Sequence, residues 1–205
     1  MHSTDFKPSD PTRFETALRH FDEENSRDPN IVHADGAAQP RELVYSKWLT
    51  EWVLKLCPEA TEELRLAARC QHICRWMVPR DSYPMTRAGY LKWREGLKRF
   101  HARKSGEILH KSGYGEDAIA RVRALNLKKD FPDDPECQVL EDALCLVFLE
   151  RQFASLAAKT SDDKMITALR KAWKKMTPAA RALAATLPYT PHEKALLDAA
   201  LTKQD

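Results

Sequence analysis

Apolar side chains recur at intervals of three and four residues along most of this chain, which is the spacing of one face of an α-helix. The first run carries Phe14, Ala17 and Phe21, and similar runs follow to the end of the chain. No clean two-residue alternation interrupts them, and the chain has only six glycines. Because alanine, leucine, lysine, arginine and glutamate dominate, local preference agrees with the periodicity. The pattern predicts an all-α fold.

Prolines, glycines and capping residues divide the pattern into separate helices. Asp10 followed by Pro11 is typical of a helix start, and Ser112 followed by Gly113 is typical of a helix end. The expected main helices cover residues 11–25, 40–56, 61–77, 87–111, 116–125, 135–158 and 161–176, and two shorter helices begin at Pro178 and Pro191.

Two connecting segments are expected to be loops. Residues 26–40 are polar and carry the turn signal Asp35-Gly36. Residues 78–86 contain Pro79 and Pro84, each of which removes a backbone donor and restricts the residue before it.

The length of 205 residues suits a single compact domain. Residues 1–12 are polar and broken by proline, so we expect a flexible N-terminal lead-in. Residues 13–176 are expected to form the compact helical domain, and residues 177–205 a C-terminal helical extension.

Charge and cysteine content indicate which partners and which cellular compartment to expect for this protein. The 33 basic and 30 acidic side chains leave a net charge of +3, which does not favour nucleic acid as the partner, although a local basic patch stays open. The five cysteines form no CxxC pair and are expected to be reduced core residues. No basic start with an apolar run and no 18-residue apolar segment occurs, so we expect a cytoplasmic protein with no membrane partner.

Three titratable residues fall where burial would be costly. Asp142 shares an apolar stripe with Val139 and Leu146. A buried carboxylate must be paired, protonated or bound to a metal, so Asp142 is either a structural ion pair or helix-cap partner, or a ligand or catalytic group. His101 is expected on the inward side of the helix over residues 87–111. His72 is expected to lie outside the apolar stripe of the helix over residues 61–77.

Two histidines and a carboxylate on three helices make a candidate metal site for iron, manganese or zinc. The candidate ligands are His72, His101 and Asp142. The alternative is that the histidines are satisfied core residues in a structural polar network.

The arginine- and tyrosine-rich segment that follows suits a phosphate joined to a planar group. Guanidinium forks bind phosphate oxygens in pairs, and aromatic rings offer flat faces. The candidate ligand-binding residues are Arg80, Tyr83, Arg87, Tyr90 and Arg94. The alternative is an ion-paired loop whose aromatic rings are anchored in the core, and Arg75 is expected on a solvent-facing helix surface.

Long motifs resemble a known family. The runs LRLAARCQHICRWMVPRDSYPMTRAGYLKWR, FHARKSGEIL and VLEDALCLVFLE are similar to domain-of-unknown-function family 4202 (DUF4202), and the likeness extends from about Phe14 to Met176. More distantly, the order of AARCQHI, HARKSGEIL and LEDA resembles the HD-domain phosphohydrolases, all-α enzymes that hold divalent metal with a histidine, a His-Asp pair and a later aspartate.

The HD resemblance implies roles for individual residues. His72 matches the histidine of the pair, Asp142 the last aspartate, and His101 an additional histidine. The chain departs from the pattern twice, because Ile73 stands where the paired aspartate belongs and the second helix has no histidine. Glu51 on that helix is a candidate replacement.

The resemblance implies an HD-like domain over residues 13–176 that binds a phosphorylated small molecule or nucleotide and, in the enzymatic version of the hypothesis, hydrolyses it with a divalent metal. In this hypothesis His72 and Asp142 are catalytic, and the arginines stabilise the developing charge. The alternative is a non-enzymatic helical module that docks a protein or RNA partner through its arginine and aromatic loop. Substrate and oligomeric state stay open.

Overall fold

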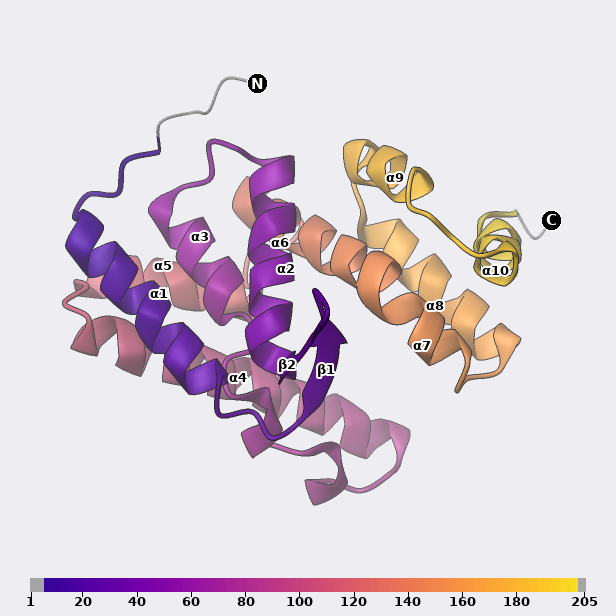
Figure 1. The fold of residues 1–205 in the computed structure, drawn as a ribbon, viewed down its shortest axis with the longest axis horizontal. Helices are drawn as coiled ribbons and strands as arrows, with labels where there is room; N and C mark the ends of the chain where they lie inside the picture. The colour runs from indigo at the N-terminus through magenta and orange to yellow at the C-terminus, as the bar shows by residue number, and fades with distance from the viewer. Residues whose placement is uncertain (1–5, 203–205) are drawn as a thin grey trace. The chain divides into compact units, whose positions relative to one another are not determined.

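The computed structural model describes residues 6–202, which are predominantly α-helical (Figure 1). The helices are α1 (Pro11–Asn25), α2 (Arg41–Leu56), α3 (Glu62–Cys70), α4 (Arg87–Lys111), α5 (Glu116–Leu127), α6 (Pro135–Val147), α7 (Phe153–Ala157), α8 (Asp162–Lys175), α9 (Pro178–Ala185) and α10 (Pro191–Leu201). The remaining elements are β1 (Ile31–Ala34), β2 (Ala37–Pro40), the 3₁₀ turns η1 (Arg75–Met77) and η2 (Arg80–Ser82), and the π-helical turn η3 (Phe148–Gln152). None of the helices in this described part is both long enough and apolar enough to span a membrane.

The chain divides into two compact units, unit 1 (residues 1–137) and unit 2 (residues 138–205). In unit 1, α4 packs on α5, and α3 packs on α1, α2 and α5. In unit 2, α8 packs on α10, and α7 contacts both. The division of units does not coincide with the expected boundary after residue 176, which stays a prediction.

Short-range sequence signals set most helix ends. Asp10 accepts a hydrogen bond from the backbone of Arg13 at 3.0 Å and so caps α1. Thr86 caps α4 in the same way. The bounds predicted for these two helices are confirmed, as are the starts of α9 and α10 at their prolines.

The part of the N-terminal lead-in that the structure describes is in contact with helices of unit 1, and the cysteines are free thiols. Residues 1–5 of the lead-in lie outside the described residues. From Phe6 on it makes contacts: the Phe6 ring lies 5.5 Å from that of Phe14, and Ser9 donates to Glu62. All five cysteines are free, and all except the half-buried Cys57 are buried, as expected of reduced core residues.

The loop predicted for residues 26–40 is wrong in part, because β1 and β2 pair there as an antiparallel hairpin. The turn at Asp35-Gly36 is confirmed: both residues have positive φ, 52° and 76°, as a tight hairpin turn requires. Each strand has only four residues, too few for alternation to be recognised in the sequence. Ahead of the hairpin, Asp28 accepts from the backbone of Glu42 at 3.0 Å and supplies the cap that Pro40 cannot give to α2.

The third predicted helix is too long. It ends at Cys70 rather than Met77, and Cys74 has a left-handed backbone with φ 53°. The side-chain oxygen of Asn25 accepts from the backbone of Cys74 at 3.1 Å and stabilises this turn. Met77, which helical spacing places on the apolar stripe, is exposed instead.

The sixth predicted helix, residues 135–158, is interrupted. It continues as α6 to Val147, widens into one π-helical turn, and resumes as α7 at Phe153.

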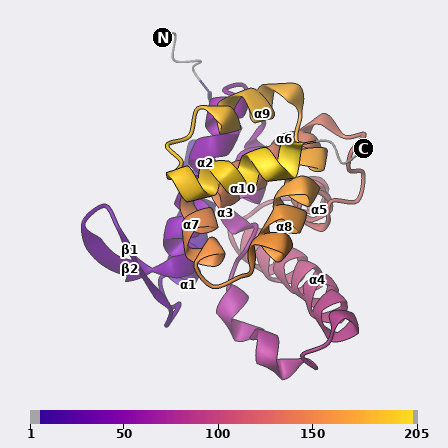
Figure 2. The same ribbon diagram turned by 90° about the vertical axis from the view of Figure 1, so that its right-hand side faces the viewer.

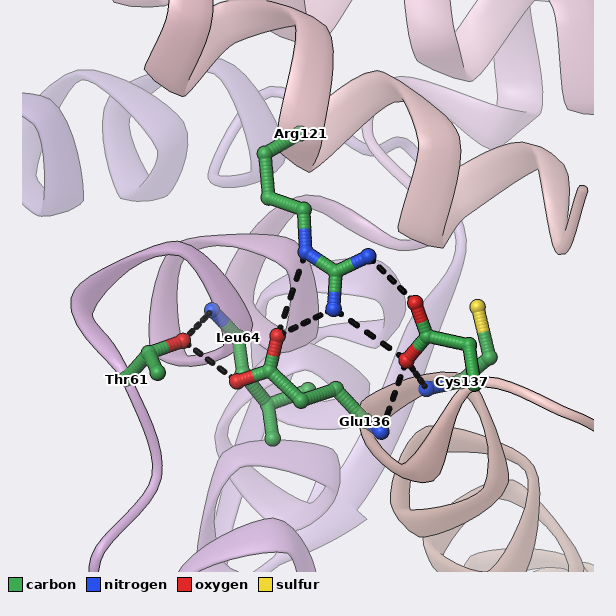
Figure 3. Close-up of polar contacts among 6 residues, drawn as sticks. Thr61, Leu64, Arg121, Glu136 and Cys137 are labelled. Carbon is green, nitrogen blue, oxygen red and sulfur yellow. Dashed lines mark hydrogen bonds and ion pairs between the residues drawn. The ribbon is translucent and has the colours of Figure 1, made fainter. Parts of the chain in front are cut away.

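A charge network in unit 1 joins the starts of α3 and α6 to α5. The guanidinium of Arg121 binds the carboxylates of both Asp134 and Glu136, and Thr61, the cap of α3, donates to Glu136 at 2.5 Å (Figure 3). Asp134 also accepts from the backbone of Glu136 and Cys137, which caps α6. The hydrogen bonds from Arg121 hold the pKa of Asp134 down at about 2.

Arg121→Ala is expected to lower the free energy of unfolding by about 1–2 kcal/mol, because several charge-assisted hydrogen bonds are lost together at a partly exposed site. The control is Arg19→Ala, which removes one exposed pair with Glu23 and should cost less than about 0.5 kcal/mol. Urea unfolding followed by circular dichroism measures both, and equal effects would contradict the network's role.

Candidate functional site

His72 lies in the turn after α3, among side chains from α2 and α4. Its ring stacks on Tyr45 with centroids 4.5 Å apart and lies 5.8 Å from the ring of His101. Its Nδ1 is 3.7 Å from Oε2 of Glu42. Together with Arg75, described below, these residues form what we call the histidine cluster. The structure thus brings together the two histidines that the sequence singled out.

Two polar atoms of the histidine cluster are buried and have no hydrogen-bond partner within residues 6–202. They are Oε2 of Glu42 and Nε2 of His101, whose residues are 3% and 4% exposed. Nδ1 of His101 lies 2.8 Å from the carbonyl oxygen of Ile73 and therefore donates to it. In the neutral ring Nε2 is then an unprotonated acceptor. The cluster thus presents two acceptors that lack a donor.

Burial and neighbouring cations keep both imidazoles neutral. Burial lowers the pKa of His101 to about 4. It also lowers the pKa of His72 well below the usual value, with further contributions from Arg75, His101, Lys128 and Arg41. Burial raises the pKa of Glu42, opposed by the charges of Arg41 and Arg75. The charges around the cluster are therefore mixed, because Arg41, Arg75 and Lys128 act on His72 while the buried carboxyl of Asp28 acts on Glu42 and helps to raise its pKa.

Arg75 adds to the histidine cluster a guanidinium that donates no hydrogen bond to the described residues. It is half-buried and lies over the ring of Trp93, 4.9 Å from the centroid. Among the described residues no side chain or carbonyl accepts a hydrogen bond from the guanidinium, and burial lowers its pKa while the charge of Glu42 opposes this. The expectation that Arg75 coats a solvent-facing helix is wrong, because α3 ends before it and the 3₁₀ turn directs it inward.

Asp142 lies in unit 2, where its carboxylate is hydrogen bonded. It accepts from the backbone and the hydroxyl of Thr177 at 3.0 and 2.6 Å, and from Gln138 at 3.0 Å. Since Thr177 caps α9, these bonds match the helix-cap alternative for Asp142. Its role as a ligand stays a prediction. Within residues 6–202, no three His, Cys, Asp or Glu side chains are placed to hold a metal ion.

The five predicted ligand-binding residues of the loop differ from one another in their contacts and exposure. The guanidinium of Arg80 donates to the carbonyl oxygens of Tyr83, Pro84 and Thr86 at 2.9, 2.8 and 3.3 Å, so it fixes the loop. The half-buried ring of Tyr83 places its hydroxyl against Gly96. The other three, Arg87, Tyr90 and Arg94, are exposed.

Sequence reasoning missed the acidic member of the cluster. Glu51, the candidate replacement on the second helix, is exposed, whereas Glu42 in the first turn of the same helix is buried. A usable signal existed, because Glu42 precedes Tyr45 by three residues and Leu49 by seven and so shares their buried face.

The fold and the cluster define a predominantly α-helical protein in which the buried His101 and the half-buried His72 lie near a carboxyl and an arginine. Residues 15–197 match the family described as Domain of unknown function (DUF4202), and the chain belongs to this family, as its motifs indicate. No curated protein and no solved structure matches the chain.

The buried neutral state of His101 predicts a loss of stability in acid. Unfolded His101 takes up a proton below about pH 6.5, whereas the folded residue does so only near pH 4. The free energy of unfolding should therefore fall as pH drops from about 6.5 to 4. In His101→Gln, whose amide can still donate to Ile73, this fall should be smaller.

The exposed His110 provides the control for that measurement. His110→Gln should keep the wild-type pH dependence in urea titrations. If the free energy of unfolding falls equally in His101→Gln and in wild type between pH 6.5 and 4, the prediction that His101 is buried without its proton is contradicted.

The hydrogen bonds of Asp142 predict a structural cost for its removal. Asp142→Ala leaves two donors of Thr177 unpaired and should lower the free energy of unfolding by about 2–3 kcal/mol. Asp142→Asn, which keeps one acceptor, should lose less. Asp198→Ala, at an exposed position of α10, should change it by less than about 0.5 kcal/mol. Wild-type stability in Asp142→Ala would contradict the capping role.

Proposed function

We propose that unit 1 binds a phosphorylated small molecule or nucleotide at the histidine cluster. The observation that carries this is the half-buried guanidinium of Arg75, which has no acceptor among the described residues and lies beside neutral His72. A guanidinium presents paired N–H donors that match two phosphate oxygens. The charges of Lys128 and Arg41, which also act on His72, add to the attraction for an anion.

The two unpartnered acceptors extend the proposal to a second part of the ligand. A buried acceptor without a donor costs about 1–3 kcal/mol, so a ligand that donates to it regains this energy. Oε2 of Glu42 and Nε2 of His101 would accept from a hydroxyl or amino group. Sugar phosphates and nucleotides carry such groups together with phosphate. The side chain of His72 is 25% exposed, so this edge of the cluster faces solvent.

Hydrolysis with a divalent metal, implied by the HD resemblance, is not part of this proposal. The expected ligand set was His72, His101 and Asp142, and the residues that the structure describes bring no three suitable side chains together. We therefore derive no step through a metal. The hydrolysis, the metal, the HD-like arrangement and the cytoplasmic location stay predictions.

Calorimetric titration of the full chain tests the proposal with inorganic phosphate, ribose 5-phosphate and adenosine monophosphate, each sugar compound paired with its unphosphorylated counterpart. We expect the phosphorylated compounds alone to bind. Arg75→Gln should raise their Kd at least about tenfold, because charge-assisted hydrogen bonds are lost. Glu42→Gln should weaken ribose 5-phosphate more than inorganic phosphate, since the sugar compound offers hydroxyl donors at a distance from its phosphate.

Arg103→Gln is the matched control, because Arg103 is an exposed arginine of unit 1 that pairs with Glu107 and lies over the ring of Phe100, both on its own helix. If Arg75→Gln does not fold, Arg75→Lys keeps the charge but loses the fork and should still bind several-fold more weakly. Absence of phosphate binding, or equal Kd values for wild type and folded Arg75 variants, would disprove the proposal.

A further inference from the structure

Residues 77–91, which lead into α4 and form its first turn, expose an unusual amount of apolar surface. Met85 is 77% and Leu91 57% exposed, and Met77 and Tyr90 are exposed as well. These four are half of the eight large apolar side chains found exposed in the described part of the chain. Figure 2 shows the chain folding into short helical turns just before α4. Clustering of this kind is typical of a binding surface.

This segment is held against α4 by specific contacts. The indole nitrogen of Trp93 donates to the carbonyl oxygen of Val78 at 2.9 Å. Pro84 lies so close to Gly89 that an added Cβ would be 2.1 Å from its carbonyl oxygen, so only glycine fits there. With Arg80 bonded to three loop carbonyls, the exposed side chains are presented on an ordered backbone. A partner would therefore lose less entropy in ordering this surface.

The same segment concentrates positive charge. Residues 76–94, which leave out Arg75 of the histidine cluster, contain four basic side chains and one acidic side chain, a net charge of +3. The whole chain also has a net charge of +3, so the charges of the rest of it balance. The charge that would complement this surface is negative.

We propose that the surface formed by Met77, Met85, Arg87, Tyr90, Leu91 and Arg94, which we call the docking surface, binds an acidic segment of a partner protein that also carries apolar side chains. Methionine side chains adapt their shape to apolar partners, and Arg87 and Arg94 pair with carboxylates. None of these six residues belongs to the histidine cluster, so substitutions in the docking surface leave the phosphate-binding residues unchanged.

The aromatic side chains favour protein over RNA as the partner. Single-stranded nucleic acid stacks its bases on open ring faces. Trp93 is buried, and the ring of Tyr90 is approached by the guanidinium groups of Arg80 and Arg94, each 5.9 Å from its centroid. Methionine and leucine, which offer no stacking face, supply the rest of the apolar surface.

Selection of a random 16-residue peptide library on the full-length protein tests the proposal. We expect the enriched peptides to combine several Asp or Glu with apolar residues. Their fluorescence anisotropy should show Kd values that rise at least tenfold in Met85→Ser/Leu91→Ser and in Arg87→Glu/Arg94→Glu. Arg103→Glu, an exposed arginine of the same helix outside the docking surface, should leave them unchanged.

All six positions are at the surface, and thermal unfolding verifies that each variant folds. The proposal is overturned if no peptide is enriched, if enriched peptides are not acidic, or if their binding ignores the docking-surface variants. It is also overturned if a 16-nucleotide single-stranded RNA or phosphatidylserine vesicles bind the docking surface more tightly than the peptides. Phosphate binding at Arg75 can succeed or fail separately.

Discussion

The hydrogen bond from Nδ1 of His101 to the carbonyl oxygen of Ile73 connects the long helix α4 to the turn that follows α3. It satisfies the backbone acceptor of Ile73 in this turn, and it fixes which nitrogen of His101 carries the proton. Since His72 directly precedes Ile73, the same bond keeps the two rings close. Arg75 begins the next turn and is positioned by the same break in the helix. The geometry of the candidate site therefore depends on α3 ending where it does.

The electrostatics of the histidine cluster follow from this geometry. Burial and nearby cations lower the pKa of both imidazoles, although the side chain of His72 is 25% exposed, so the neutral rings present lone pairs rather than charge. The positive charge stays on the arginines and Lys128. The buried carboxyl of Glu42 is stabilised by Arg41, which pairs with it at 3.2 Å, whereas Asp28 holds the Glu42 backbone but raises the pKa of its carboxyl. This separation of cationic donors from buried acceptors suits a ligand with an anionic part and a hydroxyl part.

Local signals allowed the helices to be predicted, and distant contacts explain the errors. Asp10 and Thr86 act on residues three positions away, so the helix starts they cap are visible in the sequence. The left-handed turn at Cys74 depends on Asn25, 49 residues earlier, and no local pattern reveals it. A continuous helix to Met77 would place Arg75 on a solvent-facing surface, but α3 ends at Cys70 and Arg75 begins a 3₁₀ turn. Asp142 differs, because helix capping was one of two alternatives and only the position of Thr177 could favour it.

Trp93 links the histidine cluster to the docking surface. Arg75 lies over its ring, while its indole N–H binds Val78 at the start of the exposed segment. The ring is buried and can shift only if its neighbours shift. The position of the guanidinium therefore depends on the anchors that shape the docking surface, above all the close approach of Pro84 to Gly89. A side chain at Gly89 would push Pro84 away, loosen the segment and leave Arg75 less well placed, so a glycine far from the histidines in sequence supports both sites.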